Sequence, residues 1–257
     1  MGTVTGTGTG TAPPVALVTG GAGGFGRAFA HRLAARGHAV VVADLDADGA
    51  AEVAAEVGGT SIRADVSRPE DCAAMVSLAA GHGRLDVVAL NAGIASGAAA
   101  LDPLDLEAYR RIVGVNQDAV VYGLDAAVPV LRATGGGRVV VTASLAGLVP
   151  MPADPLYTLT KTAVVGYVRA LGPPLAEVGV TVTALCPGFA DTAIVDPLRV
   201  PLAEAGMPLL SADDVGDAFL SLLDTGKPGE IWFVQPGREP GPYAFRGVPG
   251  PRAGTAQ

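Results

Sequence analysis

The chain has 257 residues, of which 49% are hydrophobic and 16% are charged, and its net charge at pH 7 is −8. This composition excludes an intrinsically disordered protein, because a chain this apolar can bury a sizeable core. The negative charge and the lack of a Lys/Arg cluster disfavour nucleic acid and anionic membrane as partners, so a small-molecule partner is favoured.

The cysteine and histidine residues predict neither a metal site nor a disulfide. Cys72 lies in a helical pattern, Cys186 ends an apolar strand pattern, and the histidines have no ligand-like spacing to them. We therefore expect two buried thiols, no metal and a reducing, cytoplasmic setting. The first residues lack a basic start and an apolar core, and no run of about 18 apolar residues follows, so neither a signal peptide nor a membrane span is expected.

Composition divides the chain into three parts. Residues 1–13 repeat Gly and Thr and predict a disordered tail, because they contain too little apolar surface to order themselves. Residues 14–235 alternate apolar strand patterns with helical patterns and predict the folded domain. Residues 236–257 are rich in Pro and Gly and form a C-terminal extension.

The domain begins with an apolar run from Val15, a glycine cluster, and a helical pattern from about Arg27 to Gly37. A strand, a glycine-rich loop and a helix N-terminus in this order bind a diphosphate, because the glycines let the backbone approach the phosphates and the helix offers free N–H donors. Two spacings fit the cluster. One uses Gly21, Gly23 and Gly26, and the other uses Gly20, Gly24 and Gly26.

A second apolar strand ends at Asp44, about 20 residues beyond the glycines. A carboxylate there accepts hydrogen bonds from ribose hydroxyls and repels a 2′-phosphate, so the sequence favours NAD over NADP. The alternative is that Asp44 is a turn or N-cap residue before the next helix.

The rest of the domain repeats the same alternation. A short strand over 60–64 leads to Asp65 and Val66, a helix follows over 69–80, and a further strand ends at Asn91, Ala92 and Gly93. Strands that alternate with helices predict an α/β fold in which one doubly wound parallel sheet carries helices on both faces.

Two helical patterns carry the residues with the most chemical interest. The first begins after Pro103 and contains Asn116, an unfavourable residue in a helix interior unless it is solvated or functional. The second carries Tyr157 and Lys161 on one face, four residues apart, where the ammonium favours the ionised phenol. That spacing alone is more typical of a surface pair with a snorkelling lysine. We also expect this helix to kink or break at the prolines that follow Gly172.

Taken together, these motifs resemble the classical short-chain dehydrogenase/reductase family over Val15 to about Val234. The resemblance rests on the following set in chain order: Thr19-Gly20-x-x-x-Gly24-x-Gly26, Asp65-Val66, Asn91-Ala92-Gly93, Asn116, Ser144, Tyr157-x-x-x-Lys161, Pro187-Gly188 and Thr192. It implies a Rossmann fold and selects the glycine spacing that uses Gly20, Gly24 and Gly26.

The resemblance also implies roles for individual residues. Tyr157 would be the general acid/base, Lys161 would lower its pKa and hold the nicotinamide ribose, and Ser144 would bind the substrate oxygen. Asn116 would complete the catalytic set by holding a water that links Lys161 to solvent. The implied NAD-binding residues are Gly20, Gly24, Phe25, Gly26, Asp44, Asp65, Val66, Asn91, Ala92, Gly93, Tyr157, Lys161, Pro187, Gly188 and Thr192.

The segment over about 189–211 is apolar and stands where the family has its substrate-covering loop. Its alternatives are ordinary surface packing or an oligomer contact. With neighbouring apolar residues it suggests a pocket for an uncharged, apolar substrate. The candidate substrate-binding residues are Ser144, Leu145, Met151, Tyr157, Phe189 and Ile194.

The resulting hypothesis is an NAD-dependent oxidoreductase that interconverts an apolar secondary alcohol and a ketone. The alternatives are an NADPH-dependent 3-oxoacyl thioester reductase and a non-catalytic dinucleotide-sensing protein on the same fold. The resemblance further implies a homo-oligomer, a tetramer or a dimer, formed through the helices that contain Asn116 and Tyr157. The apolar face of these helices is compatible with that contact but is equally typical of a face in the chain's own core. Its residues include Val120, Val121, Val164, Val165 and Val168.

Overall fold

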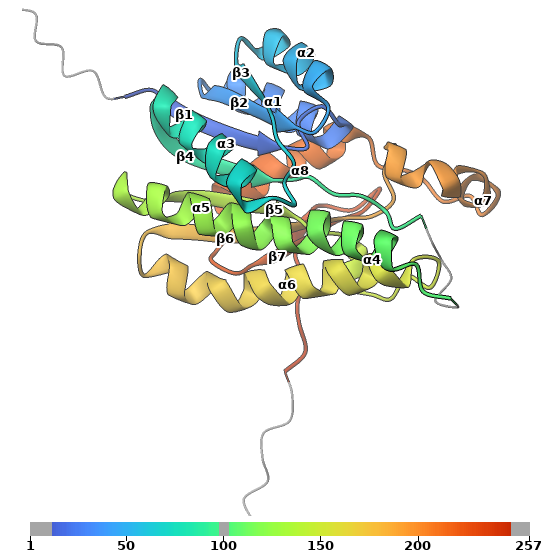
Figure 1. Cartoon of the computed structure of the whole chain (residues 1–257). Helices are drawn as coiled ribbons and strands as arrows, with labels where there is room; N and C mark the ends of the chain where they lie inside the picture. The colour runs from blue at the N-terminus through green and yellow to red at the C-terminus, as the bar shows by residue number, and fades with distance from the viewer. Residues whose placement is uncertain (1–11, 98–102, 248–257) are drawn as a thin grey trace, which may run out of the picture.

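The fold is built on one eight-stranded sheet in a computed structural model that describes residues 12–97 and 103–247 (Figure 1). The strand order is β3-β2-β1-β4-β5-β6-β7-β8, and every pairing is parallel except that of β8 with β7. The bounds are β1 Pro14–Thr19, β2 Ala39–Asp44, β3 Thr60–Arg63, β4 Arg84–Leu90, β5 Gly137–Thr142, β6 Val180–Pro187, β7 Ile231–Val234 and β8 Gly241–Pro242. The doubly wound sheet predicted from the sequence is confirmed.

Helices cover both faces of this sheet (Figure 1). One face carries α1 Gly24–Ala35, α2 Ala47–Val57 and α8 Ala212–Thr225, and the other carries α3 Pro69–His82, α5 Ala119–Ala133 and α6 Pro155–Ala176. Successive side chains of a strand point to opposite faces. In β1, Val15 and Leu17 accordingly pack in the α3/α5/α6 core, whereas Ala16 and Val18 pack in the α1/α2/α8 core. Because both faces are buried, the strands read as continuous apolar runs.

The order in which strands are added to the sheet changes direction at β1. Strands β2 and β3 are added on one side of β1, and β4 and the later strands are added on its other side. In open α/β sheets, ligands bind in the crevice beyond the carboxyl ends of the strands at such a switch point. The topology therefore locates a binding site next to the glycine loop, which directly follows β1.

The helix predicted around Asn116 consists of three parts. It begins as α4, Leu106–Val113, passes through a π-helical turn at Gly114–Asp118, and continues as α5. A π-turn inserts one residue into the α-helical ladder and is frequent at functional sites. Asn116 lies within this turn and is buried, so the solvated alternative for this residue is wrong.

The predicted end of the Tyr157 helix at its prolines is also wrong. Helix α6 continues through Pro173 and Pro174 to Ala176. The prolines lie in its last turn, and Gly172 allows the backbone of Gly229 to pack directly against the helix, since a Cβ there would lie 2.3 Å from the Gly229 nitrogen. This packing stabilises the last turn of α6 in a helical conformation, although prolines disfavour a helix there.

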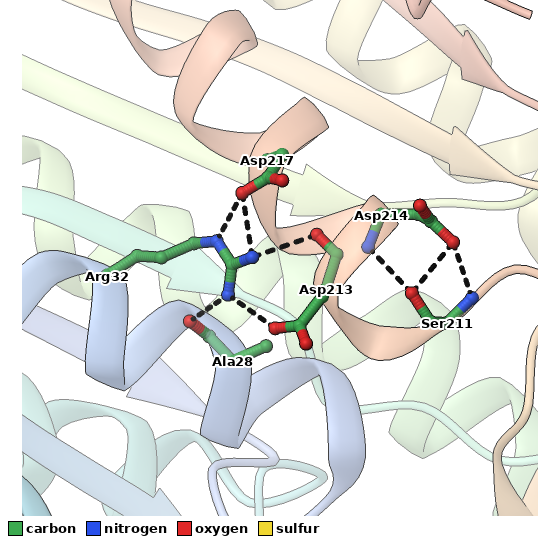
Figure 2. Close-up of polar contacts among 6 residues, drawn as sticks. All are labelled: Ala28, Arg32, Ser211, Asp213, Asp214 and Asp217. Atoms are coloured by element: carbon green, nitrogen blue, oxygen red, sulfur yellow. Dashed lines mark hydrogen bonds and ion pairs between the residues drawn. The ribbon is translucent and has the colours of Figure 1, made fainter.

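An arginine joins α1, the helix after the glycine loop, to α8, the helix after the 189–211 segment (Figure 2). The Arg32 guanidinium donates to the carboxylates of Asp213 and Asp217 and to the Asp213 carbonyl. Ser211 and Asp214 form a capping box at the start of α8. The 189–211 segment therefore leads into α8, whose N-terminus is stabilised by the capping box and whose first turns are bonded to α1 through Arg32. Within this segment lie a 3₁₀ helix at Ala193–Leu198 and α7 at Arg199–Glu204.

No helix within residues 12–97 and 103–247 is long and apolar enough to cross a membrane. Residues 1–11 of the predicted tail over residues 1–13, and residues 248–257 of the C-terminal extension, lie outside the described residues.

Candidate active site

A cavity of about 350 Å³ lies at the carboxyl ends of the strands, at the switch point of the sheet. One end contains the glycine loop, Asp44 and Asp65, and the other contains Ser144, Tyr157 and Ile194. The predicted site residues that line it are Gly20, Gly24, Phe25, Asp44, Asp65, Val66, Asn91, Ala92, Gly93, Ser144, Tyr157, Lys161, Pro187, Gly188, Thr192 and Ile194. The fold thus brings residues that end or follow strands β1 to β6, together with residues of α6, to one cavity.

The glycine loop leaves the start of α1 open towards this cavity. Gly23 is the N-cap of the helix, and no described side chain accepts from its first-turn N–H groups. Such a helix terminus binds anionic groups. Gly20 adopts φ +62°, and a Cβ there would lie 2.8 Å from the Cα of Ala92. Gly26 does not line the cavity. It packs beneath the loop, where a Cβ would lie 2.1 Å from the Gly20 carbonyl oxygen.

The Asp44 carboxylate lines the cavity and also shapes the loop. Its Oδ2 accepts from the Ala22 N–H at 3.0 Å and its Oδ1 accepts from the Asp46 N–H at 3.0 Å. The N-cap of α2 is Asp46, so the alternative reading of Asp44 as that cap is wrong. Each Asp44 oxygen keeps a further lone pair, which leaves the carboxylate able to accept hydrogen bonds from ribose hydroxyls.

Asn91 joins three strand ends below the cavity. Its side-chain amide donates to the carbonyls of Thr19 and Gly20, and its Oδ1 accepts from the Thr142 hydroxyl at 3.0 Å. Its backbone N–H donates to the Thr19 hydroxyl. The ends of β1, β4 and β5 are fixed together by these contacts, which makes a rigid floor for a bound cofactor.

Ser144, Tyr157 and Lys161 meet at the opposite end. The Lys161 ammonium lies 5.6 Å from the centre of the Tyr157 ring and donates to the Thr142 carbonyl at 2.9 Å. The Ser144 hydroxyl lies close enough to the Tyr157 phenol to act on its pKa, and both Tyr157 and Lys161 are buried. The geometry therefore presents a phenol and a hydroxyl to the cavity, with an ammonium beside the phenol.

Burial dominates the ionisation of this cluster. It raises the pKa of Tyr157 to about 12, although the hydrogen bond with Ser144 acts in the opposite direction, and it lowers the pKa of Lys161 to about 8. The pKa of Tyr157 lies above its ordinary value because removing a phenolate from water costs more than these neighbours return. That the Lys161 ammonium lowers this pKa towards working pH stays a prediction.

Asn116 lies behind the cavity rather than in its wall. Its Oδ1 accepts from the Ile94 N–H at 2.8 Å, and its amide hydrogens donate to the Ile94 carbonyl and the Thr160 hydroxyl. The side chain therefore ties the loop after β4 to α6, one residue from Lys161. Both amide hydrogens are used, so the predicted water has only the second lone pair of Oδ1 to bind.

Three predicted substrate contacts are not brought to the cavity wall. Leu145 packs against the core between the sheet and α6, Met151 packs against a small cluster around Ile112 and Leu156, and Phe189 does not line the cavity. Conversely, the sequence assigned no role to several lining residues, which are Leu45, Ala64, Val115, Thr142, Ala143, Ala190 and Ala193. Most are small apolar residues without a chemical signal. Thr142 matters through its backbone carbonyl, which no side-chain motif reveals.

Lys161 is the only cation among the described residues that line the cavity. Arg199, in the 189–211 segment, is paired with Asp191 and Asp196. Within the described part of the chain, no cluster of three or more His, Cys, Asp or Glu side chains could hold a metal ion.

Comparison with known proteins gives a consistent assignment. The family model described as short chain dehydrogenase matches residues 14–202. Cyclohexanol dehydrogenase from Acinetobacter sp. (strain SE19) is 35% identical over 199 residues, which are 75% of this chain and 78% of that protein. The 2-dehydro-3-deoxy-L-rhamnonate dehydrogenase (NAD(+)) from Sphingomonas sp. (strain SKA58) is 35% identical over 204 residues, 75% of this chain and 82% of that protein.

Among solved structures, 3-ketoacyl-(acyl-carrier-protein) reductase from Brucella melitensis complexed with NADH superimposes with a TM-score of 0.80 at 31% identity. The match covers 88% of this chain and 98% of the reductase. With the sheet order, the glycine loop and the Ser144, Tyr157 and Lys161 cluster in place, the chain belongs to the classical short-chain dehydrogenase/reductase family and is an oxidoreductase.

Proposed function

We propose that the chain transfers a hydride between NAD(H) and an uncharged, largely apolar secondary alcohol or ketone, with Tyr157 as the general acid/base. One observation carries this proposal. A single cavity joins the open helix terminus and Asp44 at one end to Ser144, Tyr157 and Lys161 at the other. A dinucleotide has its adenine at one end and its nicotinamide at the other, as these two ends of the cavity require. The glycine loop leaves room for its diphosphate.

The bound nicotinamide supplies the hydride acceptor or donor, and the chain supplies the proton path. In ketone reduction, the protonated Tyr157 phenol donates its proton to the substrate oxygen, and Ser144 holds that oxygen by a hydrogen bond. In alcohol oxidation, Tyr157 must first lose its proton, so the high pKa of the buried phenol favours faster oxidation at alkaline pH. The Lys161 ammonium beside the ring stabilises the phenolate below about pH 8, where the ammonium keeps its own proton.

Asp44 supports NAD as the preferred cofactor. Asp44→Asn keeps an acceptor for the Ala22 N–H and removes the negative charge. We expect the ratio of kcat/KM with NAD to kcat/KM with NADP to fall by about 10-fold or more, because about 1.4 kcal/mol of repulsion towards a 2′-phosphate is lost. Steady-state kinetics with both cofactors measure this ratio. Asp46→Asn, the same change two residues away and outside the cavity, is the control and should leave it unaltered. An unchanged ratio in Asp44→Asn would refute the selective role.

The cavity wall supports an uncharged substrate. Lys161 already donates to the Thr142 carbonyl and Arg199 is paired with two carboxylates, so no described residue at the cavity offers an unengaged cation for an anionic substrate. Ile94, Ile194 and Val195 give the substrate end an apolar surface. The similarity to a cyclohexanol dehydrogenase is consistent with this substrate class.

The second candidate is a reductase of 3-oxoacyl thioesters, favoured by the likeness to a 3-ketoacyl-(acyl-carrier-protein) reductase. A panel assay separates the two. The purified chain is incubated with NAD and apolar secondary alcohols of both configurations, and with NADH or NADPH and a 3-oxoacyl thioester, while NADH or NADPH absorbance is followed. Appearance of NADH with the alcohols supports the first proposal. NADPH-dependent turnover of the thioester alone would replace it with the second.

We also propose a cytoplasmic homo-oligomer, a dimer or a tetramer, that contacts through α5 and α6. The sequence left the apolar face of these helices open between this contact and the core. Four of its residues are buried in the chain's own core, namely Val120, Val164, Val165 and Val168. Val121 on α5 and Leu159 on α6 remain exposed and support an association there. Cys72 and Cys186 are free and buried, as suits a reducing compartment.

A further inference from the structure

A buried carboxylate lies between the cavity loop and the helix that carries Tyr157. Asp154 is the N-cap of α6, and its Oδ1 accepts from the Tyr157 N–H at 2.9 Å. The same oxygen accepts from the Ser96 hydroxyl at 2.7 Å, and Oδ2 accepts from the Ser96 N–H at 2.9 Å. Asp154 is 8% exposed and Ser96 is 2% exposed. Neither residue lines the cavity.

This arrangement does more than cap a helix. An N-cap needs one acceptor for an N–H of the first turn, and Ser, Thr or Asn provide it without burying a charge. Here, a charged group is buried and two of its three hydrogen bonds go to Ser96, in the loop that continues from Asn91 to Ile94 along the cavity. A carboxylate beside a helix N-terminus is stabilised by the helix dipole and by charge-assisted hydrogen bonds.

The charge of Asp154 acts on the phenol three residues away. Burial is the largest cause of the raised pKa of Tyr157, and the negative charge of Asp154 raises it further. Three other groups face the same phenol, two from neighbouring elements and one from α6 itself. Ser144 lowers the pKa through its hydrogen bond, Cys186 near the end of β6 raises it through its charged form, and the Lys161 ammonium of α6 lies beside the ring. Tyr109 of α4 packs against the same small cluster as Tyr157.

We propose that Asp154 is a positioning residue for the reaction, which fixes the first turn of α6 to the Asn91–Gly97 loop and places a negative charge near the acid/base tyrosine. The inference rests on the proposed function. By opposing loss of the proton, this charge adds to the effect of burial, so it favours a protonated Tyr157 that is ready to donate to a ketone and shifts alcohol oxidation further towards alkaline pH.

The test compares Asp154→Asn with the intact chain. Asparagine keeps an acceptor for the Tyr157 N–H, but it removes the charge and sets an amide against the Ser96 N–H. We expect the acid limb of the kcat/KM profile for alcohol oxidation to move to lower pH by about 0.5 unit or more, the order expected for one partly screened charge beyond contact distance. NAD affinity, measured by fluorescence titration, should stay the same.

Two further variants separate charge from structure. Ser96→Ala removes the hydroxyl that donates to Asp154 and keeps the charge, so it should lower kcat without moving the limb. Asp105→Asn makes the same chemical change at the exposed N-cap of α4 and should leave the profile unaltered. If Asp154→Asn lowers kcat but leaves the limb in place, Asp154 is only a structural cap and the proposal is overturned. If this variant does not fold, Asp154→Ser, an equally good N-cap without charge, replaces it.

Failure of the proposed function gives a different pattern. The intact chain would then bind NAD but oxidise no secondary alcohol. In that event, the ionisation of Tyr157 can be followed without turnover, by tyrosinate absorbance after rapid jumps to a series of alkaline pH values. Subtracting the signal of the corresponding Tyr157→Phe protein isolates Tyr157 and gives the midpoint pH of its ionisation. A lower midpoint in Asp154→Asn supports the electrostatic role of Asp154, and equal midpoints refute it.

Discussion

Tyr157→Phe is expected to lower kcat by about 10²–10⁴-fold while NAD binds with unchanged affinity. The substitution removes the hydroxyl that we assign as proton donor and acceptor and keeps the buried ring that packs against Ala146 and Leu156. Since the ring remains, the cavity should keep its shape. Single-turnover kinetics and fluorescence titration with NAD measure the two quantities on the same preparation.

Helix α6 offers a matched control for this result. Tyr167 lies on the same helix and packs, partly buried, against the core away from the cavity. Tyr167→Phe removes an equivalent hydroxyl and should leave kcat within about a factor of two, because this phenol takes no part in the proposed proton path. If Tyr157→Phe retained the activity of the intact chain, the proton-transfer role of Tyr157 would be abandoned.

Gly26→Ala should both destabilise the chain and weaken NAD binding. The added Cβ would lie 2.1 Å from the Gly20 carbonyl oxygen and 2.7 Å from the Gly21 Cα, so the glycine loop has to move. Overpacking against backbone costs about 1–3 kcal/mol or more. We expect the free energy of unfolding in urea to fall by this amount, and we expect the dissociation constant for NAD to rise by at least about 10-fold as the loop shifts.

The control for this variant is Gly81→Ala near the end of α3. No atom lies within 4 Å of a Cβ built there, and the position is helical and exposed. Alanine is favoured over glycine in a helix by about 0.5–1 kcal/mol, so the same substitution should be neutral or stabilising and should not affect NAD. Equal effects of both substitutions would contradict the close packing of Gly26 beneath the loop.

The sequence predicts the sheet and most of the site because their signals are local. Buried parallel strands read as apolar runs, and the residues that follow them, such as Gly20, Asp44 and Asn91, meet at one edge of the sheet whatever the details of the loops. The order of those strand ends along the chain is sufficient to place the glycine loop and the Tyr157 helix at the same cavity.

Other features depend on tertiary contacts and could not be predicted. Asn116 is satisfied by the Ile94 backbone and Thr160, so its cost in a helix is compensated by partners far away in the sequence. The continuity of α6 through Pro173 depends on the packing of Gly229. The raised pKa of Tyr157 follows from its burial, which spacing along a helix does not reveal.

Asp154 has one feature that the sequence predicts and one that it does not. Its place directly before Pro155 is typical of a helix N-cap, because proline is favoured at the first helical position. Its hydrogen bonds to Ser96 join segments that are 58 residues apart. The cap can be read from the sequence, and the connection to the cavity loop cannot.

Isotope transfer tests the central claim most directly. The chain is incubated with NAD and a secondary alcohol that it oxidises, which carries deuterium on its carbinol carbon. The NADH that forms is recovered and analysed by mass spectrometry and NMR. We predict one deuterium at C4 of the nicotinamide ring, together with a fall of about 10²–10⁴-fold in its rate of appearance in Tyr157→Phe. NADH without deuterium, or no NADH at all from any alcohol in the panel, would contradict hydride transfer at this site.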